Sequence, residues 1–92
     1  MKYSNGLPTA KQMISSLVDV LSISSTELNV QQIEVAISEL LDLSEEQLSI
    51  RHDNSRSEFQ YRLAWTRSYA KKQGLVISPR KKYWTVPRPS QS

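Results

Sequence analysis

Ten of the twelve basic side chains lie in the second half of the chain, where their types and spacing suit phosphate binding rather than catalysis. Residues 51–92 carry ten Lys and Arg against two Asp and Glu, a net charge of +8. Residues 1–50 carry two against seven, a net charge of −5. This asymmetry predicts that a polyanion meets only the second half. Charge alone leaves another interpretation open, in which both surfaces are simply solvated or the two halves pair with each other.

The sequence contains no residue pattern typical of an enzyme. His52 is the only histidine and cysteine is absent, so neither an ordinary zinc site nor a disulfide framework is expected. The two glycines, Gly6 and Gly74, cannot form a glycine-rich phosphate loop, and no Ser, His and Asp set for acyl transfer can be argued. We therefore expect no catalytic residues, no metal, no cofactor and no small-molecule substrate.

Two helices that carry little positive charge are predicted before the basic region. Apolar residues recur at helical spacing over residues 9–22, with Thr9 as the N-cap. The same spacing recurs over residues 30–41, and Asn29 is placed to cap that second helix. A very short strand is expected between them at residues 26–28.

A basic amphipathic helix is predicted from about Ser57 to Gln73, and Gly74 ends it. Before it, Ser44 and Gln47 have the spacing of a capping box that starts a short helical segment, and residues 51–56 are expected to form a loop. One side of the long helix should face the core. The residues of that apolar stripe are Phe59, Leu63, Thr66 and Ala70, with Trp65 and Tyr69 widening it on one side.

A basic hairpin is predicted after the long helix. Residues 75–78 and 83–86 are strand-like, and the turn Pro79-Arg80-Lys81-Lys82 joins them. The element order predicts a mainly α protein with a small β hairpin, namely a winged helix-turn-helix with three helices and a two- or three-stranded wing sheet. The domain should span residues 9–86, between a flexible N-terminus at 1–8 and a disordered tail or linker at 87–92.

A helix followed at once by a basic hairpin is how a winged helix meets a nucleic-acid duplex, with the helix in the major groove and the hairpin on the backbone. We therefore predict binding to double-stranded DNA. The residues expected to face the bases are Ser57, Gln60, Tyr61 and Ala64. Those expected to hold phosphates are Arg56, Arg67, Lys71, Arg80, Lys81 and Lys82.

Other uses of these residues remain open. The exposed helix stripe could be the ordinary surface of a three-helix bundle, and the basic turn could be a solubilising one that protects an edge strand. Arg62 is expected to be structural, with its stem on the core and its guanidinium on a carboxylate of the first or second helix. Four aromatic residues could stack on unpaired bases, although packing is the expected use of at least three. They are Trp65, Tyr69, Tyr83 and Trp84.

Two further functions remain as alternatives. A winged helix can serve as a protein-interaction module, in which the acidic first and second helices, with Glu34 and Glu39, would dock a basic partner. A single-stranded nucleic-acid binder that uses Tyr83 and Trp84 would prefer unpaired strands. No stretch approaches the roughly 20 apolar residues that span a bilayer, and the first six residues lack an apolar signal region. We therefore expect a cytoplasmic protein without a membrane partner.

Several segments resemble the N-terminal domain of Mrr-type restriction proteins. They are the leucine-rich stretch 40–47, Phe59, Arg62-Leu63-Ala64-Trp65-Thr66, Tyr69, Lys71-Lys72-Gln73-Gly74-Leu75 and Lys82-Tyr83-Trp84-Thr85-Val86. The sequence departs from the family pattern at Thr66, at Ala70 and at the turn residues Lys81 and Lys82. The resemblance implies a winged-helix DNA-binding domain, which in this family commonly precedes a restriction endonuclease domain acting on modified DNA.

The implied partners are double-stranded DNA, plain or modified, and a nuclease domain in the same chain or in a partner chain. No nuclease domain follows Val86 in this sequence. The resemblance leaves two possibilities open: a targeting domain whose residues 87–92 begin a linker, or a free-standing binder.

Overall fold

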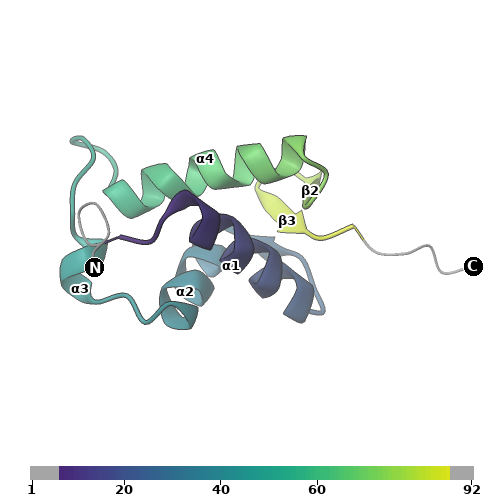
Figure 1. Cartoon of the computed structure of the whole chain (residues 1–92). Helices are drawn as coiled ribbons and strands as arrows, with labels where there is room; N and C mark the ends of the chain where they lie inside the picture. The colour runs from purple at the N-terminus through teal and green to yellow at the C-terminus, as the bar shows by residue number, and fades with distance from the viewer. Residues whose placement is uncertain (1–6, 88–92) are drawn as a thin grey trace, which may run out of the picture.

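The computed structural model of this chain describes residues 7–87. These residues form four helices and a three-stranded antiparallel sheet, and α4 lies across the other helices with the sheet at its C-terminal end (Figure 1). The predicted winged helix-turn-helix, mainly helical with a small wing sheet, is therefore confirmed. The elements are α1 (Ala10–Ile23), β1 (Leu28–Asn29), α2 (Val30–Leu40), α3 (Glu45–Leu48), α4 (Glu58–Lys72), β2 (Ile77–Arg80) and β3 (Tyr83–Thr85).

The four described helices begin with the same N-terminal capping arrangement. In each, the N-cap side chain accepts a hydrogen bond from the backbone N–H three residues later, and a glutamine there reaches back to the N-cap N–H. This capping box satisfies two backbone donors that a helix start leaves unpaired. The predicted caps Thr9, Asn29 and Ser44 are confirmed, and Ser57 caps α4. The reciprocal glutamines are Gln12, Gln32, Gln47 and Gln60.

Two helices end in the same way, with a residue at positive φ. Gly74 (φ 78°) follows α4 and Asp42 (φ 55°) follows α2. In each case the N–H of the next residue reaches back to a carbonyl of the last helical turn, from Leu75 to Ala70 and from Leu43 to Ser38, both at 2.9 Å. This is the Schellman arrangement, which turns the chain sharply out of a helix. The predicted stop at Gly74 is confirmed.

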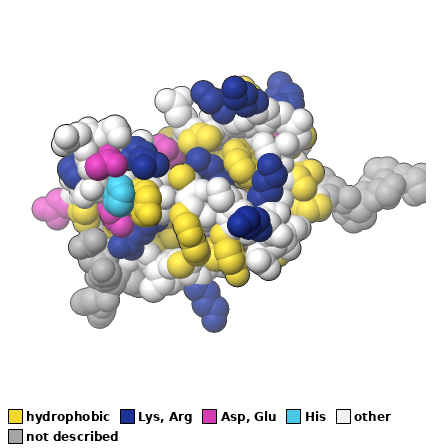
Figure 2. All heavy atoms as spheres, turned by 90° about the horizontal axis from the view of Figure 1, so that it is seen from above, with side chains coloured by type: hydrophobic (Ala, Val, Ile, Leu, Met, Phe, Trp, Pro, Cys, Tyr) yellow, Lys and Arg dark blue, Asp and Glu magenta, His cyan; other side chains and the backbone are white. Residues whose placement is uncertain are grey.

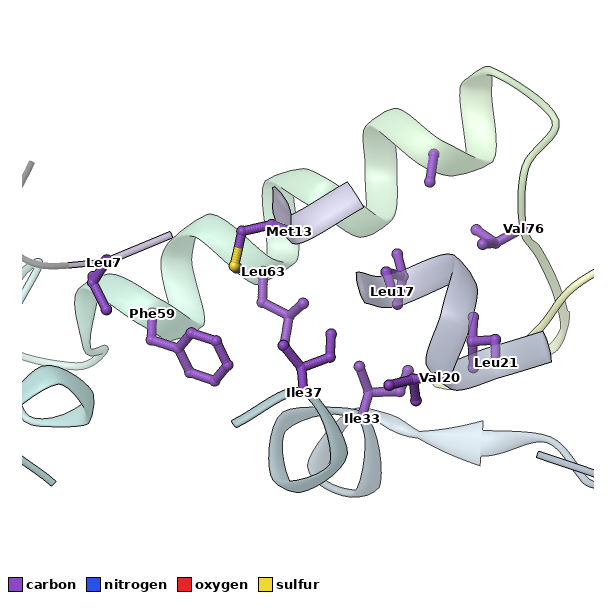
Figure 3. Packing of buried hydrophobic residues seen from close by; sticks show 11 residues of the cluster. Leu7, Met13, Leu17, Val20, Leu21, Ile33, Ile37, Phe59, Leu63 and Val76 are labelled. Carbon is purple, nitrogen blue, oxygen red and sulfur yellow. The ribbon is translucent and has the colours of Figure 1, made fainter. Parts of the chain in front are cut away.

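The hydrophobic core lies where α1, α2 and α4 meet, and Figure 3 shows their side chains pointing toward one another. Leu7, which the sequence analysis placed in the flexible N-terminus, is only 1% exposed and belongs to this core. Pro8 beside it is also buried. The packed region therefore begins before residue 9, while residues 1–6 and 88–92 lie outside the described part. The buried apolar residues are Leu7, Met13, Leu17, Val20, Leu21, Ile33, Ile37, Phe59, Leu63, Ala70 and Val76.

The wing sheet has the strand order β1-β3-β2, so β3 pairs on both sides. Strand β2 was expected at residues 75–78 but begins two residues later, at Ile77. The reason is that the Leu75 N–H closes the end of α4. Pro79 sits inside β2, where the register with β3 shifts. A proline lacks the N–H that a ladder needs, so this irregular edge position accommodates it. The turn between β2 and β3 is consequently Lys81-Lys82 alone.

The short first strand also differs from the expected range. It covers Leu28–Asn29 rather than 26–28, and Leu28 pairs with Trp84 of β3. Thr26 lies outside it because its N–H bonds to the Ser24 hydroxyl at 3.2 Å in a local turn. This strand attaches the wing to the start of α2.

Candidate nucleic-acid interface

Helix α4 has one buried side and one side open to solvent. The predicted stripe of Phe59, Leu63, Thr66 and Ala70 is buried, each of them at most 3% exposed. The Thr66 hydroxyl, polar in an apolar position, donates to the carbonyl of Arg62 at 2.7 Å and so carries no unmet hydrogen bond. The core stripe thus fixes which side of α4 is available to a partner.

The open side of α4 is unevenly charged. Figure 2 looks onto this helix and shows acidic side chains gathered at one end, which is the end of the α4 start and the preceding loop in Figure 1. Lys and Arg side chains, interleaved with apolar ones, spread over the other half, which holds the C-terminal end of α4 and the wing. A polyanion would meet its most favourable field over that half.

The loop before α4 is held in a fixed shape by Asp53. Its carboxylate accepts from the backbone N–H of Ser55 at 2.8 Å and of Arg56 at 2.9 Å. These bonds, Ser55 first, hold the pKa of Asp53 below its ordinary 3.8. Arg51 and Ser57 then pair as an antiparallel bridge across the base of the loop. The segment expected as a loop is therefore ordered against the start of α4.

Arg62 and Glu58 form an ion pair on α4. Arg62 Nε donates to Glu58 Oε2 at 2.8 Å, and its Nη1 reaches the Pro8 carbonyl at 3.4 Å. The structural role expected for Arg62 is confirmed, but its carboxylate belongs to the same helix rather than to α1 or α2, because four residues along a helix bring the two side chains together. The arginine also ties the segment before α1 to α4.

His52 lies beside the start of α4 and contacts two of its residues, which the sequence alone did not predict. Its Nδ1 lies 3.0 Å from Glu58 Oε1. Its ring stacks on Tyr61 with 3.7 Å between centroids and 9° between planes. The Arg56 guanidinium lies 5.4 Å from the centroid of the same tyrosine. Since Tyr61 is 39% exposed, a stacked aromatic and cationic cluster stands at the start of α4.

The four residues expected to face bases occupy different environments. Ser57 is 7% exposed and caps α4 through its hydroxyl, which accepts from the Gln60 N–H at 3.1 Å. The Gln60 amide oxygen accepts from the Ser57 N–H at 3.1 Å, so its amide nitrogen is the group left for a partner. Gln60 and Ala64 are half-buried, and Tyr61 is exposed. Their assignment to bases stays a prediction.

Trp65 and Tyr69 lie on the surface, which corrects the expectation that they pack in the core. They are 49% and 39% exposed, and their rings stack with 5.3 Å between centroids and 9° between planes. They fall at the margin of the core stripe, where α1 only partly covers α4. Tyr83 and Trp84 do take part in packing, being half-buried in β3. The stacked surface pair has i, i+4 spacing, the one sequence signal that could have found it.

Two predicted phosphate ligands lie on the C-terminal half of α4. Lys71 is exposed. Arg67 is half-buried, with its guanidinium 5.7 Å from the centroid of the Trp84 ring. Burial lowers the pKa of the Arg67 guanidinium, and the charge of Glu34 on α2 opposes that shift. Lys72, which was not among the predicted ligands, is exposed beside Lys71.

A third predicted ligand, Arg56, lies in the loop before α4, where its guanidinium is 3.9 Å from the Asp53 carboxylate. The wing supplies the remaining three, and two of these make no ion pair among the described residues. Lys81 and Lys82 are exposed in the turn, and Lys82 has a positive φ of 70°. Arg80 instead donates from Nε to Glu27 Oε1 at 2.9 Å, and its guanidinium lies 4.1 Å from the Tyr83 ring centroid. A phosphate contact by Arg80 would compete with this ion pair or share the guanidinium with it.

Within residues 7–87, no cluster of three or more His, Cys, Asp and Glu side chains could hold a metal ion. In the same range no helix combines the length and the apolar character that crossing a membrane requires.

Comparison with known proteins assigns the chain to a family. A family model described as the Mrr N-terminal domain matches residues 10–91. The chain belongs to this family. As an Mrr N-terminal domain it corresponds to the N-terminal region of Mrr-type restriction proteins, not to their nuclease domain. No curated protein and no solved structure showed a significant match.

The residues that carried the resemblance have structural roles in this Mrr N-terminal domain. Gly74 and Leu75 form the α4 exit. Leu41 and Leu43 at the end of α2 pack against the core. Trp84 joins β1 to the sheet and supports Arg67.

Proposed function

We propose that this Mrr N-terminal domain binds double-stranded DNA and serves, without catalysis of its own, as the targeting module of an Mrr-type restriction system. The observation that carries the proposal is the basic surface over the C-terminal half of α4 and the wing. Four exposed lysines supply it, namely Lys71, Lys72, Lys81 and Lys82. None of the ion pairs found within residues 7–87 involves a lysine.

Unpaired lysines suit phosphate contact for a physical reason. A side chain held by a carboxylate must give up that partner before it meets a phosphate, whereas a solvated lysine exchanges only counterions. The exposed positions of α4 can then enter the major groove, with Tyr61, Gln60 and Ala64 as candidate base contacts. The proposed partner is duplex DNA, with base modification as the feature that a restriction system would read.

The family suggests the wider context of the proposal. A nuclease domain, in the same chain or in a partner chain, would cut the DNA that this domain selects, and the proposed place of action is the cytoplasm. In this arrangement the present domain needs neither metal nor cofactor.

The test is the affinity for a labelled duplex, measured by fluorescence anisotropy. Replacing Lys81 and Lys82 together with Gln should weaken binding to every sequence and make the log–log salt slope less negative by roughly 2, about one unit for each phosphate contact. Lys11→Gln, which removes one exposed positive charge from α1, is the matched control and should leave the slope unchanged.

An unchanged affinity in the wing variant would exclude the wing from the interface. Binding to a basic protein that depends on Glu34 and Glu39, without any duplex binding, would favour the protein-interaction alternative. A preference for unpaired strands that depends on Trp84 would favour the single-stranded alternative.

A further inference from the structure

A groove of about 640 Å³ lies where the start of α2, the wing and the C-terminal half of α4 meet. Residues 29–31 line it together with Tyr83 and Trp84 of β3, and Asn29 is paired with Tyr83 in the sheet. Arg67 enters from α4, and Lys82 stands at the wing side. These residues come from separate elements of the chain, and only the fold brings them together.

Two hydrogen-bond donors beside this groove have no acceptor. Arg67 Nε and Trp84 Nε1 are buried and make no hydrogen bond among the described residues. Buried polar groups are almost always paired, because an unpaired donor loses its water without compensation. An arginine and a tryptophan in contact, both with unmet donors, therefore mark a place where an acceptor is missing.

The charge around the groove defines which acceptor would fit. The Arg67 guanidinium is held against the Trp84 ring at 5.7 Å, and no carboxylate of the described residues lies within ion-pair distance of it. Glu34 acts on Arg67 only from further away. Lys82 adds a second cation, and this one is exposed. Arginine stays protonated in proteins, so the site presents donors and positive charge and suits an anion.

We infer that this groove seats a phosphate group of the DNA backbone, with Lys82 closing on it from the wing and with the Arg67 and Trp84 side chains shifting to bring their covered donors to it. The inference rests on the proposed function and specifies where the backbone is anchored. The groove volume falls in the range of about 300–1,000 Å³ that holds small organic molecules, so a sugar fits together with its phosphate. The first turn of α2 adds the positive end of that helix to the same groove.

A phosphate-binding role and a purely structural role of Arg67 predict opposite effects of Arg67→Met on stability. If Arg67 served the fold, Arg67→Met would lower the Tm. In the site inferred here, Met keeps the stem in place and removes an unpaired buried charge, so the Tm should hold or rise while DNA affinity falls. Trp84→Phe keeps a packed ring and removes only the indole N–H, and it should weaken DNA binding in the same direction.

The experiment uses the full 92-residue chain and a set of duplexes in which single backbone phosphates are replaced by neutral methylphosphonates. Wild-type protein should lose affinity roughly tenfold at one backbone position, the loss expected for a charged hydrogen-bonded contact. Arg67→Met should bind more weakly and show no further loss at that position. Lys71→Met, which removes a charge from the same helix outside the groove, should keep the loss there.

Several results would contradict the inference. If Arg67→Met keeps the full response at every phosphate, or lowers the Tm without changing affinity, the groove is not the anchor, although duplex binding and the proposed function would stand. If wild-type protein binds no duplex, both fail. A Tm increase with inorganic phosphate at constant ionic strength, lost in Arg67→Met and seen without duplex binding, would identify a free-anion site instead.

Discussion

At the scale of single residues, Glu58 connects the loop, α4 and the segment before α1. It accepts from Arg62 and contacts His52, and these bonds, Arg62 first, hold the pKa of Glu58 below its ordinary 4.5 against the effect of burial. A carboxylate with a lowered folded-state pKa binds its proton more readily in the unfolded chain. Its contribution to stability is therefore complete above 4.5 and disappears as the pH falls through the lowered value.

Glu58→Gln should reduce the pH dependence of stability at the acid end. Between about pH 5 and pH 3, the Tm of the wild-type protein should fall more than that of the variant, because only the wild-type side chain titrates. Thermal unfolding monitored by circular dichroism at several pH values measures this difference. Asp53 has a lowered pKa as well, so Asp53→Asn serves as the comparison. Parallel pH profiles for wild type and Glu58→Gln would contradict the account.

Residue roles that depend on close neighbours were predictable from the sequence, and those that depend on packing were not. The caps Thr9, Asn29 and Ser44 act over three residues, so their spacing was sufficient to find them. The buried donor of Arg67 arises only because α2 and β3 close around it. Trp65 was predicted to pack in the core but lies on the surface. Periodicity gives the angle of a residue around the helix, but it does not tell how much of the helix a neighbouring element covers.

At the scale of elements, α2 and α4 offer a matched pair of helix ends. Both use the same backbone arrangement, with Asp42 at one and Gly74 at the other. A Cβ added at Gly74 would meet no atom within 4 Å, so a substitution there costs backbone strain rather than a clash. Residues with a side chain disfavour this left-handed conformation, and aspartate tolerates it better than most.

Gly74→Ala should therefore lower the free energy of unfolding by about 1 kcal/mol, and Asp42→Gly should raise it by about 0.5 kcal/mol. For a domain of this size, 1 kcal/mol corresponds to roughly 4–8 °C in Tm. Chemical denaturation of both variants beside wild type measures the two changes. Changes of the same sign in both variants would show that the helix ends do not control stability in this way.

In the wing, the two hairpin strands were predicted but their positions and one long-range ion pair were not. The existence and order of the two hairpin strands followed from turn residues and strand propensity, and both are confirmed. Their positions shifted because Leu75 completes the end of α4 and Pro79 falls at the irregular part of β2. The ion pair between Arg80 and Glu27 joins residues 53 positions apart, so no local pattern could have predicted it.

At the scale of the whole molecule, the sequence predicted the division of charge, and the fold determines where that charge lies. The half with net charge +8 contains α4 and the wing. Figure 2 shows Lys and Arg side chains without acidic neighbours over the part of the face that holds the end of α4 and the wing, and basic side chains mixed with acidic ones at the opposite end. The acidic residues of the first half lie outside α4 and the hairpin. Two of them act on arginines there: Glu34 of α2 on Arg67, and Glu27 on Arg80. We therefore expect the end of α4 and the wing to be the surface that binds phosphate.

The most direct test is the affinity of the wild-type chain for one labelled duplex over a series of salt concentrations, with plain and with cytosine- or adenine-modified DNA. We expect a log–log slope near −5, the value for about six phosphate contacts, and tighter binding to a modified duplex if the domain targets a restriction system. An absence of binding even at low salt would contradict this expectation.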